Sequence, residues 1–310
     1  MRIAVFGTGG VGGYFGGRLA EAGEDVAFIA RGEHLAAIRE RGLRVDSPEG
    51  DFLIHPAAAH DDPGEVGPVE AVIVAVKAWQ LPEAAAAMKP LVDRATFIVP
   101  LLNGVDAPDV LAAALGREHV LGGLCRIFAH IEGPGHIVHT GFPPTIDFGE
   151  LEGGRTERVQ RFADSLGRCK AVIPTVHDDV VAAMWMKFAF IAAVSGVGSV
   201  TRAPYGVIRS IPETRALLEQ AMAEVQAVGR ARGVELADDL VDRIMAIVDG
   251  LAADEIPSMQ RDVLAGRPSE LEAQNGAVVR LGAEAGVPTP VHRFLYASLL
   301  PQERAARGEV

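Results

Sequence analysis

The sequence predicts a protein in two parts: a Rossmann-type α/β domain with a doubly wound parallel sheet over residues 1–175, and an all-α domain over residues 176–310. Three observations lead to this prediction. A glycine cluster directly follows the first apolar run, short β-branched runs alternate with helical patterns in the first half, and helical periodicity dominates the second half. A length of 310 residues also suits two domains.

Five short apolar runs are the expected strands of the first part. None of them shows polar alternation, which indicates strands that are buried on both faces, as in a parallel sheet between helices. A helical pattern follows each of the first two runs, ending near Ala22 and covering residues 34–42. The runs span residues 2–6, 25–30, 70–76, 95–101 and 171–176.

Two segments interrupt this alternation and are expected to be antiparallel. In residues 43–54 the letters SPEGD form a turn signal between two short strands. In residues 130–141 the letters EGPG predict the tip of a hairpin.

Helical patterns and the prolines between them organise the second half. The most apolar stretch, Phe188–Val200, is too short to span a bilayer comfortably, so it predicts a buried core helix. The polar tail QERAARGEV, residues 302–310, is expected to fray. The expected helices cover residues 178–196, 213–232, 236–251, 269–285 and a short stretch after Pro290.

Composition narrows the function classes. Apolar residues make up 49% and charged residues 23%, which is ordinary for a water-soluble globular protein. The net charge of −12 disfavours a nucleic-acid or anionic-membrane partner. The two cysteines, Cys125 and Cys169, lack metal-ligand spacing, so neither a metal site nor a disulfide is expected. With no signal-peptide pattern at the start, a reducing cytoplasm fits.

The glycine cluster matches the G-x-G-x-x-G pattern of a dinucleotide cradle rather than a simple turn, because it follows a β run and opens a helical pattern. Gly7 allows the tight turn out of the strand, Gly9 lets a pyrophosphate approach the backbone, and Gly12 lets the helix pack close to the sheet. The phosphates would sit at the helix N-terminus. The expected cofactor-binding loop is Gly7, Thr8, Gly9, Gly10, Val11 and Gly12.

The end of the second apolar run indicates which dinucleotide is bound. An NAD site usually has an acidic residue there, but this run ends in Ala30 followed by Arg31. A guanidinium can pair with a 2′-phosphate through its planar fork. We therefore expect NADP(H) rather than NAD(H). The alternative is that Arg31 only faces solvent.

Several further segments, taken with the glycine loop and Arg31, resemble the ketopantoate reductase family (2-dehydropantoate 2-reductases). The resemblance covers nearly the whole chain and keeps the order and spacing of the motifs. The segments that carry it are VKAWQ (76–80), LLNGVDA (101–107), HIEGPGHIVHTG (130–141), MWMKFAF (184–190) and PSMQRDVLAGRPSELEAQNG (257–276).

The resemblance implies NADPH-dependent reduction of a 2-oxo acid, by default 2-dehydropantoate to pantoate, and a helical domain like that of 6-phosphogluconate dehydrogenase. Lys187 matches the family's catalytic lysine, whose apolar surroundings suit a general acid. By the same resemblance, Glu270 is the active-site glutamate that also lies at the cofactor, and Ser258 binds the substrate carboxylate.

Two more positions follow from the resemblance. Asn103 matches an asparagine near nicotinamide and substrate, and Lys77 matches a lysine that lines the cofactor site. Taken singly, Glu270, Ser258, Asn103 and Lys77 each have an ordinary explanation. They would be a helix-surface glutamate, an N-cap serine, a turn asparagine and a surface lysine.

The chain departs from the family pattern on the helix that carries Lys187. The family usually has asparagine four and eight residues after this lysine, on the same helix face, where the chain has Ile191 and Ser195. Both positions are expected at the substrate, so the identity of the 2-oxo acid stays open, and a more apolar 2-oxo acid is an alternative. A further alternative is a non-catalytic NADP-binding sensor. The apolar helical half could also bury a homodimer interface.

Overall fold

The computed structural model describes residues 1–310 and divides the chain into two compact units. The α/β unit comprises Met1–Leu102 and Asp106–Val180. The helical unit comprises Val181–Val310 together with the short segment Asn103–Val105, which the sequence pattern had assigned to the first part. The predicted fold class, a Rossmann-type sheet followed by a helical part, is confirmed.

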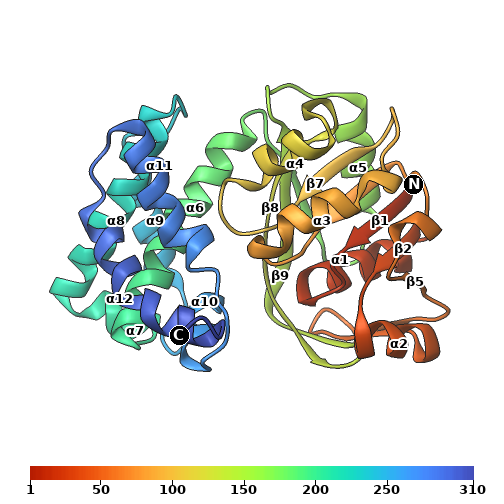
Figure 1. Cartoon of the computed structure of the whole chain (residues 1–310), viewed down its shortest axis with the longest axis horizontal. Helices are drawn as coiled ribbons and strands as arrows, with labels where there is room; N and C mark the ends of the chain where they lie inside the picture. The colour runs from red at the N-terminus through yellow and green to blue at the C-terminus, as the bar shows by residue number, and fades with distance from the viewer. The chain divides into compact units, whose positions relative to one another are not determined.

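The core of the α/β unit is a five-stranded sheet in which every pair of neighbours is parallel. The N-terminal strand β1 lies at its centre, flanked by β2 and β6. Figure 1 labels β5, β2, β1 and β7 of this sheet. The order is β5 (Ala58–His60), β2 (Asp25–Ile29), β1 (Arg2–Phe6), β6 (Ala71–Val74) and β7 (Phe97–Pro100). Four of these strands match predicted runs; β5 was not predicted.

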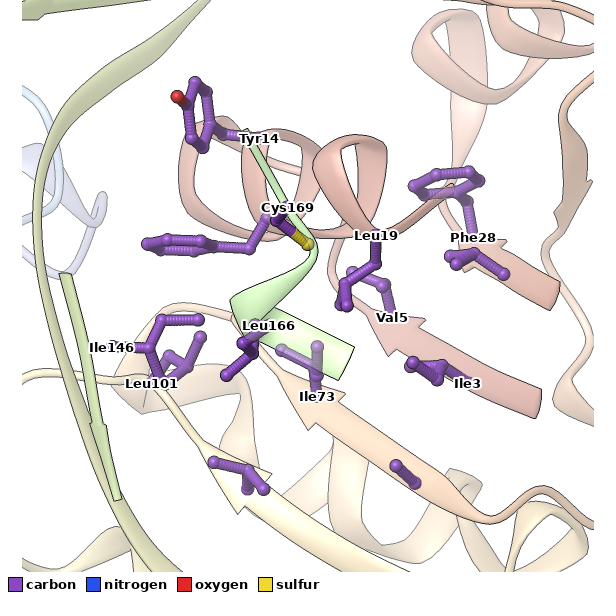
Figure 2. Close-up of a cluster of buried hydrophobic side chains, with 14 of the residues drawn as sticks. Ile3, Val5, Tyr14, Leu19, Phe28, Ile73, Leu101, Ile146, Leu166 and Cys169 are labelled. Atoms are coloured by element: carbon purple, nitrogen blue, oxygen red, sulfur yellow. The ribbon is translucent and has the colours of Figure 1, made fainter. Parts of the chain in front are cut away.

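The strands are buried on both faces, as the lack of polar alternation predicted. In β1, Ile3 and Val5 belong to one hydrophobic cluster, whereas Ala4 and Phe6 belong to another. Alternate side chains of a strand point to opposite faces, so helices must cover both. Figure 2 shows the first cluster, in which Leu19 of helix α1 (Gly10–Glu21) points toward Val5 of β1. Tyr14 lies on the other side of the helix, with its ring centre 4.8 Å from that of His139 in β9 (His136–Glu150).

The remaining helices of the α/β unit divide between these two clusters. Helices α2 (Gly32–Arg41) and α5 (Glu157–Gly167) contribute to the cluster under α1, and α3 (Leu81–Ala87) and α4 (Ala107–Leu115) contribute to the other. Single 3-10 turns lie at Pro63–Glu65, Ala78–Gln80, Lys89–Leu91 and Arg117–His119.

A second sheet contains both of the predicted antiparallel segments. Strands β3 (Leu43–Asp46) and β4 (Phe52–Ile54) pair antiparallel around the SPEGD turn, as expected. The predicted hairpin is also present, but it is far longer than expected, because β8 (Leu121–Gly133) and β9 (His136–Glu150) pair over most of their length.

The prediction for the last apolar run was wrong. Strand β10 (Ile173–Val176) does not join the buried parallel sheet but pairs with β9 at the edge of the second sheet. Ile173 is 50% exposed there, so the run is not buried on both faces.

The helical unit packs around one apolar helix, α6 (Val180–Thr201). Its buried residues, among them Phe188, Ala192 and Ala193, share one cluster with residues of five other helices. These are α7 (Tyr205–Ser210), α8 (Pro212–Ala231), α9 (Leu240–Gly250), α11 (Ala277–Ala285) and α12 (Pro290–Ala306). The remaining helix is α10 (Ser258–Leu264).

Helix α6 is long and apolar enough to cross a membrane by length and composition alone. However, 61% of its most apolar window is buried inside the structure. It is therefore the buried core helix that the stretch Phe188–Val200 predicted.

Two expectations for the C-terminal region were wrong. Residues 269–285 do not form one α-helix, because the π-helix η5 (Glu272–Gly276) precedes α11. The tail does not fray from residue 302, because α12 continues to Ala306 and the side chain of Glu303 is buried. The Glu303 carboxylate accepts hydrogen bonds from the amide and the hydroxyl of Ser269, which ties the tail to the segment before η5.

Candidate functional site

The glycine loop leaves the carboxyl end of the central strand β1 and is hydrogen-bonded to the carboxyl end of its neighbour β2. Gly7 has φ +98°, and a Cβ at this position would lie 2.8 Å from Val76 and 2.9 Å from the main-chain oxygen of Ala75. The amides of Gly7 and Thr8 both donate to the oxygen of Ile29 at 3.2 Å. The turn therefore requires glycine at position 7 for both its backbone conformation and its close packing.

Gly12 and Gly9 differ in what surrounds them. A Cβ on Gly12 would overlap the main-chain oxygen of Gly7, so the absence of a side chain lets α1 approach the strand. Beside Gly9, the N-cap of α1, an added Cβ would meet no atom of the chain within 4 Å. The N-terminus of a twelve-residue helix is thus paired with an open backbone position, and these residues fit the pyrophosphate of a dinucleotide.

Three other loop residues have different surroundings. The buried hydroxyl of Thr8 donates to the oxygen of Ile29 at 3.0 Å, so this hydroxyl fastens the loop to β2. A Cβ on Gly10 would lie 2.5 Å from the oxygen of Ala129 in β8, so the second sheet restricts this position to glycine. Val11 is partly buried in the first turn of α1. The cofactor contacts of these three residues stay predictions.

Two cations flank the glycine loop at the same edge of the sheet. Arg31 follows β2, and Lys77 follows β6, the two strands on either side of β1. The Arg31 guanidinium lies 3.2 Å from the Glu83 carboxylate, and both side chains are mostly exposed. The Lys77 ammonium lies 5.8 Å from the centre of the Trp79 ring. Parallel strands present ligand-binding residues at their carboxyl ends, where these residues lie.

The sequence pattern missed His34 of α2, which binds the tip of the β8–β9 hairpin. Its Nδ1 accepts a hydrogen bond from the Gly135 amide at 3.0 Å, which connects α2 to the tip of the β8–β9 hairpin. Burial lowers the pKa of His34, which favours the neutral imidazole. Nothing in the helical sequence pattern around His34 predicts its hydrogen bond to Gly135.

In the helical unit, the structure brings together two of the predicted residues. The Asn103 side-chain amide donates to the Glu270 carboxylate at 2.9 Å, and Glu270 is only 5% exposed. Gly104 has φ +96°, and a Cβ there would lie 2.9 Å from the oxygen of Ala273. The dipeptide Asn-Gly therefore does two things: the amide holds the carboxylate, and the glycine lets the segment approach η5.

The segment that carries Glu270 is fixed from both sides. The Glu303 carboxylate binds Ser269 on the preceding side. On the following side, the Tyr296 hydroxyl donates to Glu272 at 2.7 Å; burial and this bond raise the pKa of Tyr296 to about 12. The Gly276 amide bonds to the oxygen of Leu271, the i to i+5 pattern of a π-turn, and such turns are frequent at functional sites.

The remaining predicted residues lie on α6 and α10. Lys187, Ile191 and Ser195 share one face of α6 at successive turns; Lys187 and Ile191 are partly buried, and Ser195 is fully buried. Ser258 is the partly buried first residue of α10. A Cβ on Gly198 of α6 would overlap the Gln260 amide of α10, so these two helices touch close to Ser258.

Comparison with known proteins extends over both units. The family model described as ketopantoate reductase PanE/ApbA matches residues 3–153, and the model described as its C terminal matches residues 179–303. An uncharacterized oxidoreductase of Bacillus subtilis is 31% identical, and the match covers 96% of this chain and 98% of that protein. A 2-dehydropantoate 2-reductase of Mesorhizobium japonicum is 30% identical, covering 94% of each chain.

A solved structure agrees with these relatives. The crystal structure of a PanE/ApbA family ketopantoate reductase from Ralstonia eutropha is 31% identical and superposes with a TM-score of 0.89. The match covers 99% of this chain and 100% of that one. The similarity therefore extends along nearly all of this chain and all of that one.

Proposed function

The chain belongs to the ketopantoate reductase family and is an oxidoreductase that uses a nicotinamide cofactor, and on this premise we propose that it reduces a 2-oxo acid to a 2-hydroxy acid. The default substrate is 2-dehydropantoate, with pantoate as the product, a step toward pantothenate. The observation that carries the proposal is the buried Asn103–Glu270 hydrogen bond, because it holds a carboxylate in the unit that also presents Lys187.

For the cofactor we propose NADPH, bound by the loop from Gly7 to Gly12 with Arg31 and Lys77. The N-terminus of α1 would hold the pyrophosphate, and the Arg31 guanidinium would bind the 2′-phosphate. The present partner of Arg31, the Glu83 carboxylate, is exposed, and this supports the role. The guanidinium can exchange this carboxylate for the 2′-phosphate at the surface, so no charge has to be buried.

The residues of the chain have separate tasks in this proposal. When bound, the nicotinamide supplies a hydride to the ketone carbon. Lys187 donates the proton that the developing alkoxide oxygen requires, and its ammonium stabilises the charge on that oxygen. Glu270, held by Asn103, orients the lysine or the substrate hydroxyl, and Ser258 binds the substrate carboxylate. One hydride and one proton together convert the ketone to the alcohol.

A second candidate substrate is a 2-oxo acid with an apolar side chain. The observation that favours it is Ile191, one turn after Lys187, which packs against the apolar core of the helical unit. An aliphatic side chain cannot hydrogen-bond the hydroxyl of 2-dehydropantoate, and it suits an alkyl or aryl group instead. The small hydroxyl of Ser195 lies one turn further along, fully buried.

The experiment that tests the proposal is a panel of 2-oxo acids assayed by NADPH oxidation. The default predicts the highest kcat/KM with 2-dehydropantoate, and higher values with apolar 2-oxo acids would favour the second candidate. NADPH binding with no turnover of any ketone would point to a cofactor sensor. The Lys187→Ala variant separates catalysis from binding, because it should abolish turnover and leave NADPH affinity intact.

The setting that we propose is the cytoplasm, with small molecules as the principal partners. Both cysteines, Cys125 and Cys169, are free and buried, which suits a reducing compartment. Burial raises the pKa of the Cys169 thiol to about 12, so this thiol is unreactive. A homodimer through the helical unit is part of the proposal, and sedimentation of the purified protein tests it.

A further inference from the structure

Asn275, in the π-helix η5, binds the backbone of α6 directly. Its side-chain Nδ2 donates to the main-chain oxygen of Ala192 at 3.0 Å, and the side chain is fully buried. A Cβ on Gly196 would lie 2.5 Å from the same nitrogen. The amide therefore occupies the space that any side chain at position 196 would need, and the two segments touch backbone to side chain.

This contact lies between the two groups that carry the proposed chemistry. Ala192 follows Lys187 by little more than one turn of α6, and Asn275 follows Glu270 by about one π-turn. Other described bonds of Glu270 and its neighbours lead to Asn103, Glu303 and Tyr296. The Asn275 bond is the one among them that reaches the helix of the lysine.

Of the two polar atoms in the Asn275 side chain, only the donor Nδ2 has a hydrogen-bond partner within the chain. The Oδ1 of Asn275 and the nearby hydroxyl of Ser195 are buried without a protein partner. Burying unpartnered oxygens is unfavourable, and an apolar residue of the same shape would avoid it. The bond from Nδ2 to Ala192 is therefore the polar contact that this side chain contributes to the fold.

We propose that Asn275 is a positioning residue for the reduction: its bond to Ala192 fixes the segment of Glu270 against the helix of Lys187. The inference rests on the roles proposed above for Lys187 and Glu270. A displacement of about 1 Å in a catalytic group can lower a rate by roughly 100-fold. Loss of the bond should therefore reduce kcat while the KM for NADPH, whose proposed loop lies in the other unit, changes little.

The test uses a pair of variants that separate packing from the hydrogen bond. Asn275→Ala removes both the bond and the volume of the amide, so kcat and Tm should fall together. Adding Gly196→Ala to Asn275→Ala places a methyl group 2.5 Å from the former position of Nδ2, and alanine is also favoured over glycine within a helix. The end of the Leu295 side chain, 2.9 Å from that methyl group, must shift to accept it. We expect the double variant to regain part of the lost Tm but to keep the low kcat, roughly 10- to 100-fold below the parent.

Gln226→Met is the matched control. Gln226 is a buried amide of α8 in the same unit, and its Nε2 donates to the oxygen of Ala237 at 2.6 Å. Its loss removes the same kind of bond, so it should lower Tm and leave kcat unchanged. The inference is overturned if Asn275→Ala retains parental kcat, or if the double variant recovers kcat together with Tm.

The proposed function fails by a different result. If Lys187→Ala turns over the 2-oxo acid at the parental rate, the roles on which the inference rests are wrong. If Lys187→Ala is inactive while Asn275→Ala behaves like Gln226→Met, the function stands and only the positioning role is lost.

Discussion

The side-chain amide of Asn103 donates to the carboxylate of Glu270 across a sequence separation of 167 residues, and the carboxylate is nearly fully buried. A buried carboxylate needs hydrogen-bond donors, and Asn103 supplies one from a three-residue segment that packs with the helical unit. Replacing Asn103 should therefore disturb the Glu270 carboxylate.

Asn103→Ala should lower kcat/KM for the 2-oxo acid by roughly 10- to 100-fold, because a hydrogen bond to a charged group contributes about 1.5–3 kcal/mol. Asn103→Asp should be worse at neutral pH, since it places a second carboxylate at 2.9 Å from the first. Steady-state kinetics on both variants measures the effect. Equal activity of Asn103→Asp and the parent would contradict it.

Arg31→Ala should weaken NADPH binding by about 1.5–3 kcal/mol and change NADH binding little, because only NADPH carries the 2′-phosphate. The control is Glu83→Gln, which removes the carboxylate 3.2 Å from the guanidinium and should tighten NADPH binding slightly. Isothermal titration calorimetry with NADPH and with NADH measures the affinities of both variants. A parallel loss of both affinities would show that Arg31 does not recognise the phosphate.

Ile191→Asn should shift substrate preference toward 2-dehydropantoate, because an amide can hydrogen-bond the substrate hydroxyl that isoleucine cannot. We expect the ratio of kcat/KM values for 2-dehydropantoate over an apolar 2-oxo acid to rise by about 10-fold or more. Ile191→Val keeps the apolar character and serves as the control. An unchanged ratio in Ile191→Asn would place this side chain away from the substrate.

Acid should weaken the helical unit through Glu224. Burial alone would raise the pKa of this carboxyl, but hydrogen bonds from the His292 ring and from the amides of His292 and Val291 bring it below the usual 4.5. A depressed pKa means that the stabilisation is fully present above the unfolded pKa and is lost as pH falls through the folded one.

Glu224→Ala should therefore lower the free energy of unfolding by about 1.5–3 kcal/mol at pH 7, and by progressively less below pH 4.5. Denaturant melts at several pH values measure the difference. Glu219→Ala in the same helix is the control; its carboxylate is half-exposed beside Arg215, so the change should be small at every pH. A pH-independent effect of Glu224→Ala would refute the assignment.

The sequence predicted the parts of the fold that depend on local pattern. The runs around Val5, Phe28, Ile73 and Val99 have no polar interruption, and each became a strand buried on both faces. The glycine positions were predictable for the same reason, because a tight turn and a close helix permit few other residues.

Pairing between distant segments was less predictable. The strand β9 contains Pro143 and Pro144, and prolines argue against a strand. They are tolerated here because they fall between Thr140 and Thr145, where β9 is not paired with β8. The tail looked frayed because its letters are polar, but Glu303 is buried as the acceptor for Ser269. Polarity alone cannot tell a solvated carboxylate from one with a buried partner.

The candidate site was also predictable only in part. The motifs predicted Lys187, Glu270 and Asn103 as site residues. No pattern in the sequence could predict that Asn103 binds Glu270 or that Asn275 binds Ala192. Those pairings depend on how helices and turns pack, and a single buried amide has no periodic signature.

The segment Asn103–Val105 has a consequence for anyone who cuts or recombines this chain. It belongs to the helical unit but is encoded between β7 and α4 of the α/β unit. A fragment starting at Val181 would leave Glu270 without its amide donor. A chimera that joins the first part of one relative to the second part of another would pair an asparagine and a glutamate of different ancestry. The unit of exchange among such proteins is therefore discontinuous, and a transplanted helical half should carry its three-residue insert with it.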